Sequence, residues 1–158
     1  MSEDIYLTRG FFHKLHDEFE QLKKESIKIS GEIETARLQG DLSENAEYDA
    51  AKEAQAHNAA RRSDLEDKLA RVKIIEDQDI PADKIYIGAI VTLEDLDTDE
   101  KMKYMMVSAE ESNYEENKVS ILSPIGKALL GHGKGEELEI EVPAGILKYK
   151  VLKIKRPK

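Results

Sequence analysis

Two acidic residues, Asp41 and Glu44, stand three positions apart in a short run of polar and small residues. Carboxylate oxygens are the ligands that Mg²⁺ prefers, and a bound Mg²⁺ usually takes one or two of them and keeps several waters. Two acids are too few to hold the ion alone, so they would complete a site whose other ligands come from a partner. The same residues suit another role, because Asp41 can N-cap a following helix while Glu44 closes a capping box. Spacing alone leaves both roles open.

Long segments with a coiled-coil pattern flank these acids. Apolar and small residues recur there at alternating steps of three and four, which is the a/d pattern of a helical seam. Before the acids, the a/d positions hold Phe12, Leu15, Phe19, Leu22, Ser26, Ile29, Ile33 and Ala36. After the acids, they hold Tyr48, Ala51, Gln55, Asn58, Arg62, Leu65, Leu69 and Val72. We therefore expect an antiparallel helical hairpin whose chain reverses at the acids.

The middle of the predicted seam is polar. A reversal near Leu42 sets Leu22 opposite Arg62. It also sets Ser26 opposite Asn58, whereas large apolar residues face one another at the open end. Polar a/d residues specify the register of a coiled coil at a cost in stability, so we expect one strict antiparallel register.

The composition changes near residue 80, which we take as the boundary between a domain of residues 1–79 and one of residues 80–158. After it, short β-branched runs are broken by Gly, Pro, Asn and Asp. These runs predict strands over residues 85–93, 101–108, 118–122, 137–142 and 146–154. Ser123 as N-cap, Pro124 at the first helical position and Gly131 as a stop predict one short helix. The predicted fold is therefore α+β: an antiparallel coiled-coil hairpin followed by a small, mainly antiparallel β domain.

The overall composition excludes several classes of protein. The 158 residues include no cysteine, which rules out disulfides and thiolate metal sites. Without a run of about 18 apolar residues or a basic-then-apolar start, we expect a cytoplasmic protein that is neither exported nor inserted into a membrane. The net charge of −9 makes the chain a poor binder of bare nucleic acid. Any nucleic-acid role should therefore run through a protein partner.

A family resemblance covers nearly the whole chain. Residues 36–55, which read ARLQGDLSENAEYDAAKEAQ, closely resemble the signature of the bacterial Gre transcript-cleavage factors. The opening Tyr6-Leu7-Thr8 with Gly10 is similar to the start of that family, and residues 123–131 are similar to its C-terminal signature. Sparse basic residues around the acids favour the GreA-like branch. The resemblance implies that the β domain has an FKBP-like fold.

The resemblance also implies a function in transcription elongation. In this family the C-terminal domain docks on RNA polymerase at the rim of its secondary channel, and the hairpin enters that channel. The catalytic acids of the family fall on Asp41 and Glu44, which would share Mg²⁺ with the polymerase and stimulate cleavage of backtracked RNA, rescuing arrested complexes. The protein would not be an enzyme by itself. We expect a monomer in solution and no membrane partner.

Three further residues receive roles from the resemblance. Arg37 and Lys52 match a small basic patch that the family directs toward the 3′ segment of the backtracked RNA. The family commonly has arginine where Lys52 stands, and lysine lacks the bidentate fork of arginine. Tyr48 has two open interpretations: it contacts the RNA, or it only closes the helical seam.

Other functions compete with cleavage stimulation. A Gre-like inhibitor would plug the polymerase channel without promoting cleavage, but such relatives depart from the acidic pattern that Asp41 and Glu44 keep. A plain coiled-coil adaptor would use the acids only as helix caps. A prolyl isomerase needs an aromatic-lined apolar pocket. Residues 80–158 contain tyrosines but neither Phe nor Trp, so we expect no isomerase activity. His13 and His16 are interpreted as helix-surface residues, not metal ligands.

Overall fold

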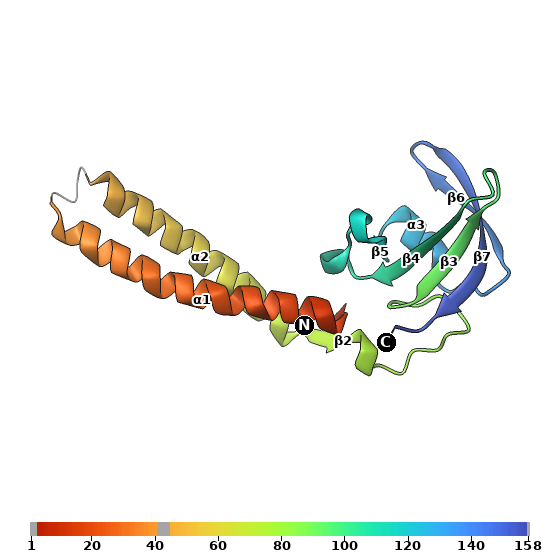
Figure 1. The fold of residues 1–158 in the computed structure, drawn as a ribbon, viewed down its shortest axis with the longest axis horizontal. Coiled ribbons are helices and arrows are strands. Elements are labelled where there is room, and N and C mark those ends of the chain that lie inside the picture. Colours follow the sequence, from red (N-terminus) through yellow and green to blue (C-terminus); the bar gives the residue numbers. More distant parts are fainter. Residues whose placement is uncertain (1–2, 41–44, 158) are drawn as a thin grey trace. The chain divides into compact units, whose positions relative to one another are not determined.

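The computed structural model describes residues 3–40 and 45–157, which form two compact units. One unit is the helical hairpin, Phe12–Arg71. The other combines the N-terminal residues up to Phe11 with the residues from Val72 onward (Figure 1). The compact units therefore do not follow the simple order of the chain, because the first strand belongs with the C-terminal part.

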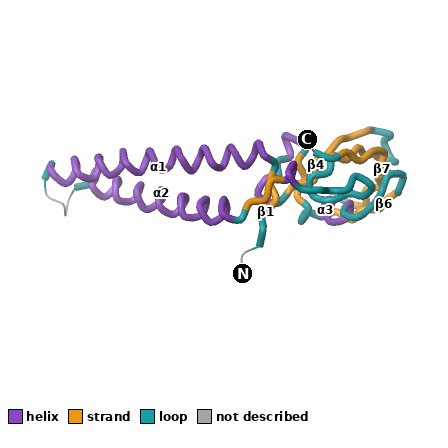
Figure 2. The backbone as a smooth tube through the Cα atoms, turned by 90° about the horizontal axis from the view of Figure 1, so that it is seen from below, coloured by secondary structure: helices purple, strands orange, loops and turns teal. Residues whose placement is uncertain are grey.

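The hairpin consists of α1 (Arg9–Leu38) and α2 (Ala46–Ala70), which lie side by side and run in opposite directions (Figures 1 and 2). Every predicted a/d residue of both helices is buried or half-buried, while most residues between them are exposed. The predicted coiled-coil hairpin is thus confirmed. Val72 was predicted to be the last a/d residue of the second helix, but α2 ends at Ala70 and Val72 belongs to a strand.

The register of the two helices differs from the predicted one. Asn58 donates a hydrogen bond from Nδ2 to the carbonyl oxygen of Leu22 at 2.9 Å, and Ser26 Oγ lies 3.4 Å from Gln55 Oε1. The prediction that set Leu22 opposite Arg62 and Ser26 opposite Asn58 is therefore wrong by one a/d step. The same a/d residues form the interface between the helices. Hydrogen bonds from the polar a/d residues determine which a/d position of α2 lies opposite each a/d position of α1.

A two-stranded parallel ladder joins distant parts of the sequence. Strand β1 (Ile5–Leu7) pairs with β2 (Val72–Ile74), with Ile5 opposite Val72 and Leu7 opposite Ile74. The side chain of Leu7 is fully buried. Neither strand was predicted, because three residues are too few to show a period of two. Three short 3-10 helices follow in the same unit: η1 (Ile75–Asp77), η2 (Ala109–Glu111) and η3 (Tyr114–Glu116).

The C-terminal part is built on a five-stranded sheet with the strand order β5-β4-β3-β7-β6. All neighbours are antiparallel except β4 and β5, which run parallel. The strands are β3 (Ile90–Asp95), β4 (Lys101–Val107), β5 (Lys118–Ser120), β6 (Glu137–Val142) and β7 (Gly145–Lys155). The hydrophobic core of this part of the chain contains Ile85, Ala89, Val91, Leu93, Met106, Leu129, Ile140, Tyr149 and Val151. This arrangement confirms the predicted fold class.

The short helix was predicted correctly and the first strand of this sheet was not. Helix α3 (Pro124–Leu129) begins after Ser123, whose Oγ accepts a hydrogen bond from the Gly126 N–H at 3.0 Å. In contrast, β3 begins at Ile90 and not at residue 85. Gly88 interrupts the predicted strand, because its φ of +90° is incompatible with an extended ladder. None of the described helices is long and apolar enough to cross a membrane.

Candidate functional site

The end of the hairpin where the chain reverses carries the residues that the sequence singled out. Helix α1 ends at Leu38, and the Gln39 N–H donates a hydrogen bond to the Ala36 carbonyl oxygen at 3.2 Å. Gly40 follows with a φ of +155°, a conformation that favours glycine. Asp41 and Glu44, the two predicted Mg²⁺ ligands, lie outside the described residues.

Asn45 begins the second helix and holds it to the first. Its Oδ1 accepts a hydrogen bond from the Tyr48 N–H at 3.1 Å, which makes Asn45 the N-cap of α2. Its Nδ2 donates to the carbonyl oxygen of Ala36, one of the last carbonyls of α1. The helix that starts at Ala46 is therefore capped by Asn45. Asp41, the other residue considered as a cap, lies outside the described residues.

The other predicted site residues flank this end. The Asn45–Ala36 bond brings the last turn of α1, which contains Arg37, next to the first turn of α2, which contains Tyr48. Arg37 and Lys52 are exposed, and neither forms an ion pair with another described residue. Two cations that pair with no acidic residue of ranges 3–40 and 45–157 therefore lie on the helices that flank the reversal.

Tyr48 is half-buried at the third position of α2. This burial agrees with its place in the helical seam, next to the buried Ala51. Burial of the ring does not decide between the two interpretations, because a tyrosine presents an apolar ring and a polar hydroxyl at its tip. Contact between Tyr48 and RNA therefore stays a prediction.

The described residues contain no group of three or more His, Asp or Glu side chains that could hold a metal ion. His16 Nε2 lies 3.9 Å from Glu20 Oε1, one helical turn away on the surface of α1. This contact is an ordinary surface pair on a helix. The interpretation of His16 as a surface residue therefore agrees with the structure.

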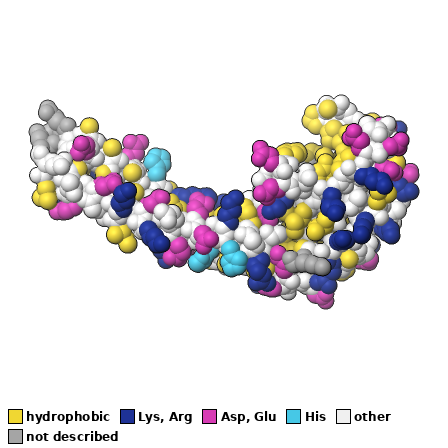
Figure 3. Space-filling view, in the orientation of Figure 1, with side chains coloured by type: hydrophobic (Ala, Val, Ile, Leu, Met, Phe, Trp, Pro, Cys, Tyr) yellow, Lys and Arg dark blue, Asp and Glu magenta, His cyan; other side chains and the backbone are white. Residues whose placement is uncertain are grey.

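A second candidate site is an apolar cleft of about 520 Å³ in the C-terminal part of the chain. Apolar side chains gather over this part in the space-filling view (Figure 3). The cleft is lined by Tyr104, Ser112, Asn113, Tyr114, Lys118, Val119, Ser120, Ser123, Pro124, Ile125, Val142, Pro143 and Leu147. Tyr114 is 87% exposed, so a large aromatic surface faces solvent there. Sequence reasoning placed residues 123–125 in a family signature but missed the cleft that they help to form.

Two tyrosines in the cleft bear on the isomerase alternative. Tyr104 and Tyr114 line it together with Pro124 and Pro143. The chain thus has an apolar pocket with aromatic side chains, although it lacks Phe and Trp in this region. The expected absence of isomerase activity stays a prediction.

The chain thus combines a helical hairpin with a small β domain that carries an apolar cleft. Residues 5–74 match the family model described as "Transcription elongation factor, N-terminal". Residues 80–156 match the one described as "Transcription elongation factor, GreA/GreB, C-term". The chain belongs to the GreA/GreB family of transcription elongation factors.

Two curated relatives agree with this assignment over nearly the full length of the chain. The chain is 49% identical over 156 residues to "Transcription elongation factor GreA" of Chloroherpeton thalassium, a match that covers 98% of this chain and 99% of that protein. It is 43% identical over 155 residues to the protein of that name from Syntrophotalea carbinolica, covering 98% of each. Among solved structures, the GreA factor homolog 1 (Gfh1) of Thermus thermophilus is 29% identical with a TM-score of 0.45, covering 97% of this chain and 99% of that one.

Proposed function

We propose that the protein binds RNA polymerase, inserts the end of its hairpin into the secondary channel and stimulates Mg²⁺-dependent cleavage of backtracked RNA. The observation that carries this proposal is the full-length match to elongation factors, which includes both family segments. A newly cut RNA 3′ end would lie in register with the active centre of the polymerase. The outcome is the rescue of an arrested elongation complex.

Asp41 and Glu44 are the proposed catalytic residues. Their carboxylates are hard oxygen ligands, and one or two such ligands with several waters is the usual environment of Mg²⁺. When bound, the ion supplies a polarised water and charge stabilisation for phosphodiester hydrolysis. The two carboxylates would hold the ion together with ligands from the polymerase. The factor would then have no nuclease activity alone.

The capping of α2 supports this role. Asp41 and Glu44 had a competing interpretation as the N-cap and capping box of α2, but Asn45 is the residue that accepts the Tyr48 N–H. The described start of α2 therefore needs neither carboxylate. Acids that the helix does not need are available for a ligand.

Arg37, Lys52 and Tyr48 would support the reaction from the flanks of the acids. Arg37 and Lys52 are exposed cations without a described acidic partner, so their charges are free to meet phosphates. Tyr48 would offer its hydroxyl at the same end. These residues would hold the 3′ segment of the RNA, whereas the acids would act at the bond that is cut.

The apolar cleft would provide the contact with the polymerase. Exposed apolar surface with a polar rim is typical of protein–protein interaction sites, and exposed tyrosines are enriched at such interfaces. Tyr114→Ser removes the most exposed aromatic ring of the cleft and leaves the core of the sheet intact. We expect this variant to lose polymerase affinity, measured by competition with the labelled native factor. Unchanged affinity would argue against docking through the cleft.

Halted, backtracked elongation complexes with labelled RNA provide the test of the acids. Asp41→Asn and Glu44→Gln should reduce Mg²⁺-dependent cleavage at least roughly tenfold, because loss of groups around a metal typically costs that much. Raising the Mg²⁺ concentration should restore part of the rate. Asp49→Asn and Glu47→Gln are the matched controls, since they make the same chemical changes in the first turn of α2.

Each outcome of this test has a distinct meaning. Cleavage that is lost only in the Asp41 and Glu44 variants, with native helicity and polymerase binding, supports the ligand role. Equal cleavage by all variants would overturn that role. A native protein that blocks RNA extension without stimulating cleavage would instead establish the channel-plugging inhibitor.

A further inference from the structure

Glu111 is a fully buried carboxylate that binds a residue 103 positions away. Its side chain has no exposed surface. Glu111 Oε1 accepts a hydrogen bond from the Thr8 N–H at 2.9 Å, and Oε2 accepts one from the Thr8 hydroxyl at 2.6 Å. Both residues belong to the unit that contains the β domain. A buried carboxylate is costly unless it is paired, so this arrangement requires a reason.

Thr8 occupies the N-cap position of α1, directly before Arg9. Its hydroxyl accepts a hydrogen bond from the Phe11 N–H at 3.3 Å, which is the N-cap to N3 bond of a helix start. In a capping box, the side chain at N3 would in turn accept the N-cap N–H. Phe11 cannot do so, and the first turn of α1 has no acidic residue. Glu111 supplies this missing acceptor from the β domain.

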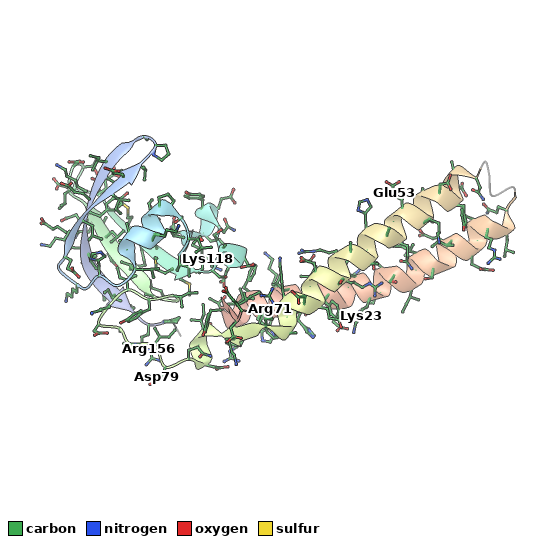
Figure 4. All side chains as sticks on the ribbon, turned by 180° about the vertical axis from the view of Figure 1, so that it is seen from behind. Lys23, Glu53, Arg71, Asp79, Lys118 and Arg156 are labelled. Atoms are coloured by element: carbon green, nitrogen blue, oxygen red, sulfur yellow. The ribbon has the colours of Figure 1, made fainter. Side chains whose placement is uncertain are left out.

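Lys118 balances the charge of Glu111. Its Nζ lies 3.1 Å from Glu111 Oε2 and 3.2 Å from Glu116 Oε2, and the residue is labelled in Figure 4. Burial opposes the charged form of Lys118, but hydrogen bonds to Glu111 and Glu116 raise its pKa. The carboxylate of Glu111 thus accepts three hydrogen bonds, two from Thr8 and one from Lys118.

A change in the direction of the first turn of α1 is amplified along the helix and displaces its last turn. Helix α1 is continuous over 30 residues, so its two ends are about 45 Å apart at 1.5 Å per residue. A tilt of about 5° in the first turn would therefore displace the last turn by roughly 4 Å. A misplacement of about 1 Å can cost roughly a hundredfold in rate at a reacting centre.

We propose that Glu111 is a positioning residue, which completes the N-cap of α1 from the β domain and thereby fixes the first turn of the helix that carries the hairpin end. The inference rests on the proposed function, because its consequence is measured as cleavage. It predicts that Glu111 contributes to the reaction without touching RNA or metal. It also predicts that affinity for the polymerase and cleavage at saturation respond differently to its loss.

Four variants separate this role from general stability. Glu111→Gln places an amide donor against a donor, and Thr8→Val removes the hydroxyl while keeping the shape. Thr8→Ser keeps the hydroxyl and therefore both of its hydrogen bonds, the one that it donates to Glu111 and the one that it accepts from the Phe11 N–H. Glu116→Gln is the matched control, because it also removes a partner of Lys118 but makes no described contact with α1. Thr8→Val leaves every residue of the sheet native, so it decides the question if Glu111→Gln unfolds.

Amide hydrogen exchange reports the helix start directly. Exchange at Thr8 and Phe11 should be roughly tenfold faster or more in Glu111→Gln and Thr8→Val, since a lost buried hydrogen bond lowers the cost of local opening. Thr8→Ser and Glu116→Gln should exchange at the native rate. Native exchange in Glu111→Gln and Thr8→Val would overturn the proposed anchoring.

Cleavage kinetics report the positioning. With polymerase affinity within about twofold of native, we expect maximal cleavage at saturating Glu111→Gln or Thr8→Val to fall roughly tenfold or more. Full cleavage at saturation, or a loss confined to affinity, would overturn the positioning role. A native factor that fails to stimulate cleavage would overturn the proposed function and this role with it, whereas exchange would still decide whether Glu111 holds the helix start.

Discussion

Asn45 and Ala36 are joined by a hydrogen bond that closes the hairpin at its reversal, from the Asn45 Nδ2 to the Ala36 carbonyl oxygen. The other side-chain atom of Asn45, Oδ1, caps α2 through the Tyr48 N–H. One amide group therefore satisfies a donor at the start of α2 and an acceptor at the end of α1. The Tyr48 N–H is one of the donors that a helix start leaves without a partner, and the Ala36 carbonyl oxygen accepts from Asn45 in addition to the Gln39 N–H.

Replacement of Asn45 should separate these two contributions. Asn45→Ala removes both hydrogen bonds and should lower the free energy of unfolding by about 1–2 kcal/mol, the usual cost of a lost N-cap. Asn45→Asp keeps the capping oxygen but loses the donor to Ala36, so its cost should be smaller. Urea unfolding followed by helical circular dichroism measures both values. Equal costs for the two variants would show that the capping oxygen contributes nothing.

The helical seam could be predicted from the sequence because its period is carried by many residues. Each a/d position from Phe12 to Ala36 is buried or half-buried. The register could not be predicted, because it depends on the few polar seam residues. Asn58 bonds to the backbone of Leu22 and not to a side chain opposite it, and a backbone acceptor leaves no trace in the sequence.

Short and distant contacts also escaped prediction. Strands β1 and β2 pair over only three residues each, and Glu111 meets Thr8 across 103 positions. Sequence patterns report local periodicity, whereas these contacts arise only once the chain has folded. The roles of Arg37, Tyr48 and Lys52 came from the family resemblance and stay predictions; the structure places these residues on the helices on either side of the reversal. The placement of Asp41 and Glu44 remains a prediction.

The ion pair between Glu18 and Arg61 should make the hairpin sensitive to acid. Arg61 Nε lies 2.7 Å from Glu18 Oε2, and Nη2 lies 3.1 Å from Oε1, so the pair is bidentate. The hydrogen bonds to Arg61 lower the pKa of Glu18 below its ordinary value of 4.5. A lowered pKa means that the contribution to stability is present above pH 4.5 and is lost as the pH falls through the lower folded-state value.

We expect a small effect, because solvent screens a pair whose side chains are 42% and 40% exposed. Glu18→Gln should cost about 0.5 kcal/mol at pH 7, typical of an exposed pair. The difference from native should shrink as the pH is lowered past 4.5, as measured by urea unfolding over a pH series. Arg61→Lys keeps the positive charge but loses the bidentate contact, so its free energy of unfolding should lie between those of the native protein and Glu18→Gln. A difference that stays constant with pH would contradict the ionic contribution.

Gly126 and Gly31 should respond to alanine in opposite directions. A Cβ atom on Gly126 would lie 1.9 Å from the Ser120 carbonyl oxygen, and backbone cannot yield as a flexible side chain does. Gly126→Ala should therefore destabilise the β domain by about 1–3 kcal/mol or more, as overpacking does. A Cβ on Gly31 in α1 would meet nothing within 4 Å, so Gly31→Ala should stabilise the helix by about 0.5–1 kcal/mol. Thermal unfolding of the two variants beside the native protein measures both changes. A native-like Gly126→Ala would show that α3 can move away from Ser120 at little cost, and the close approach would then not explain the glycine.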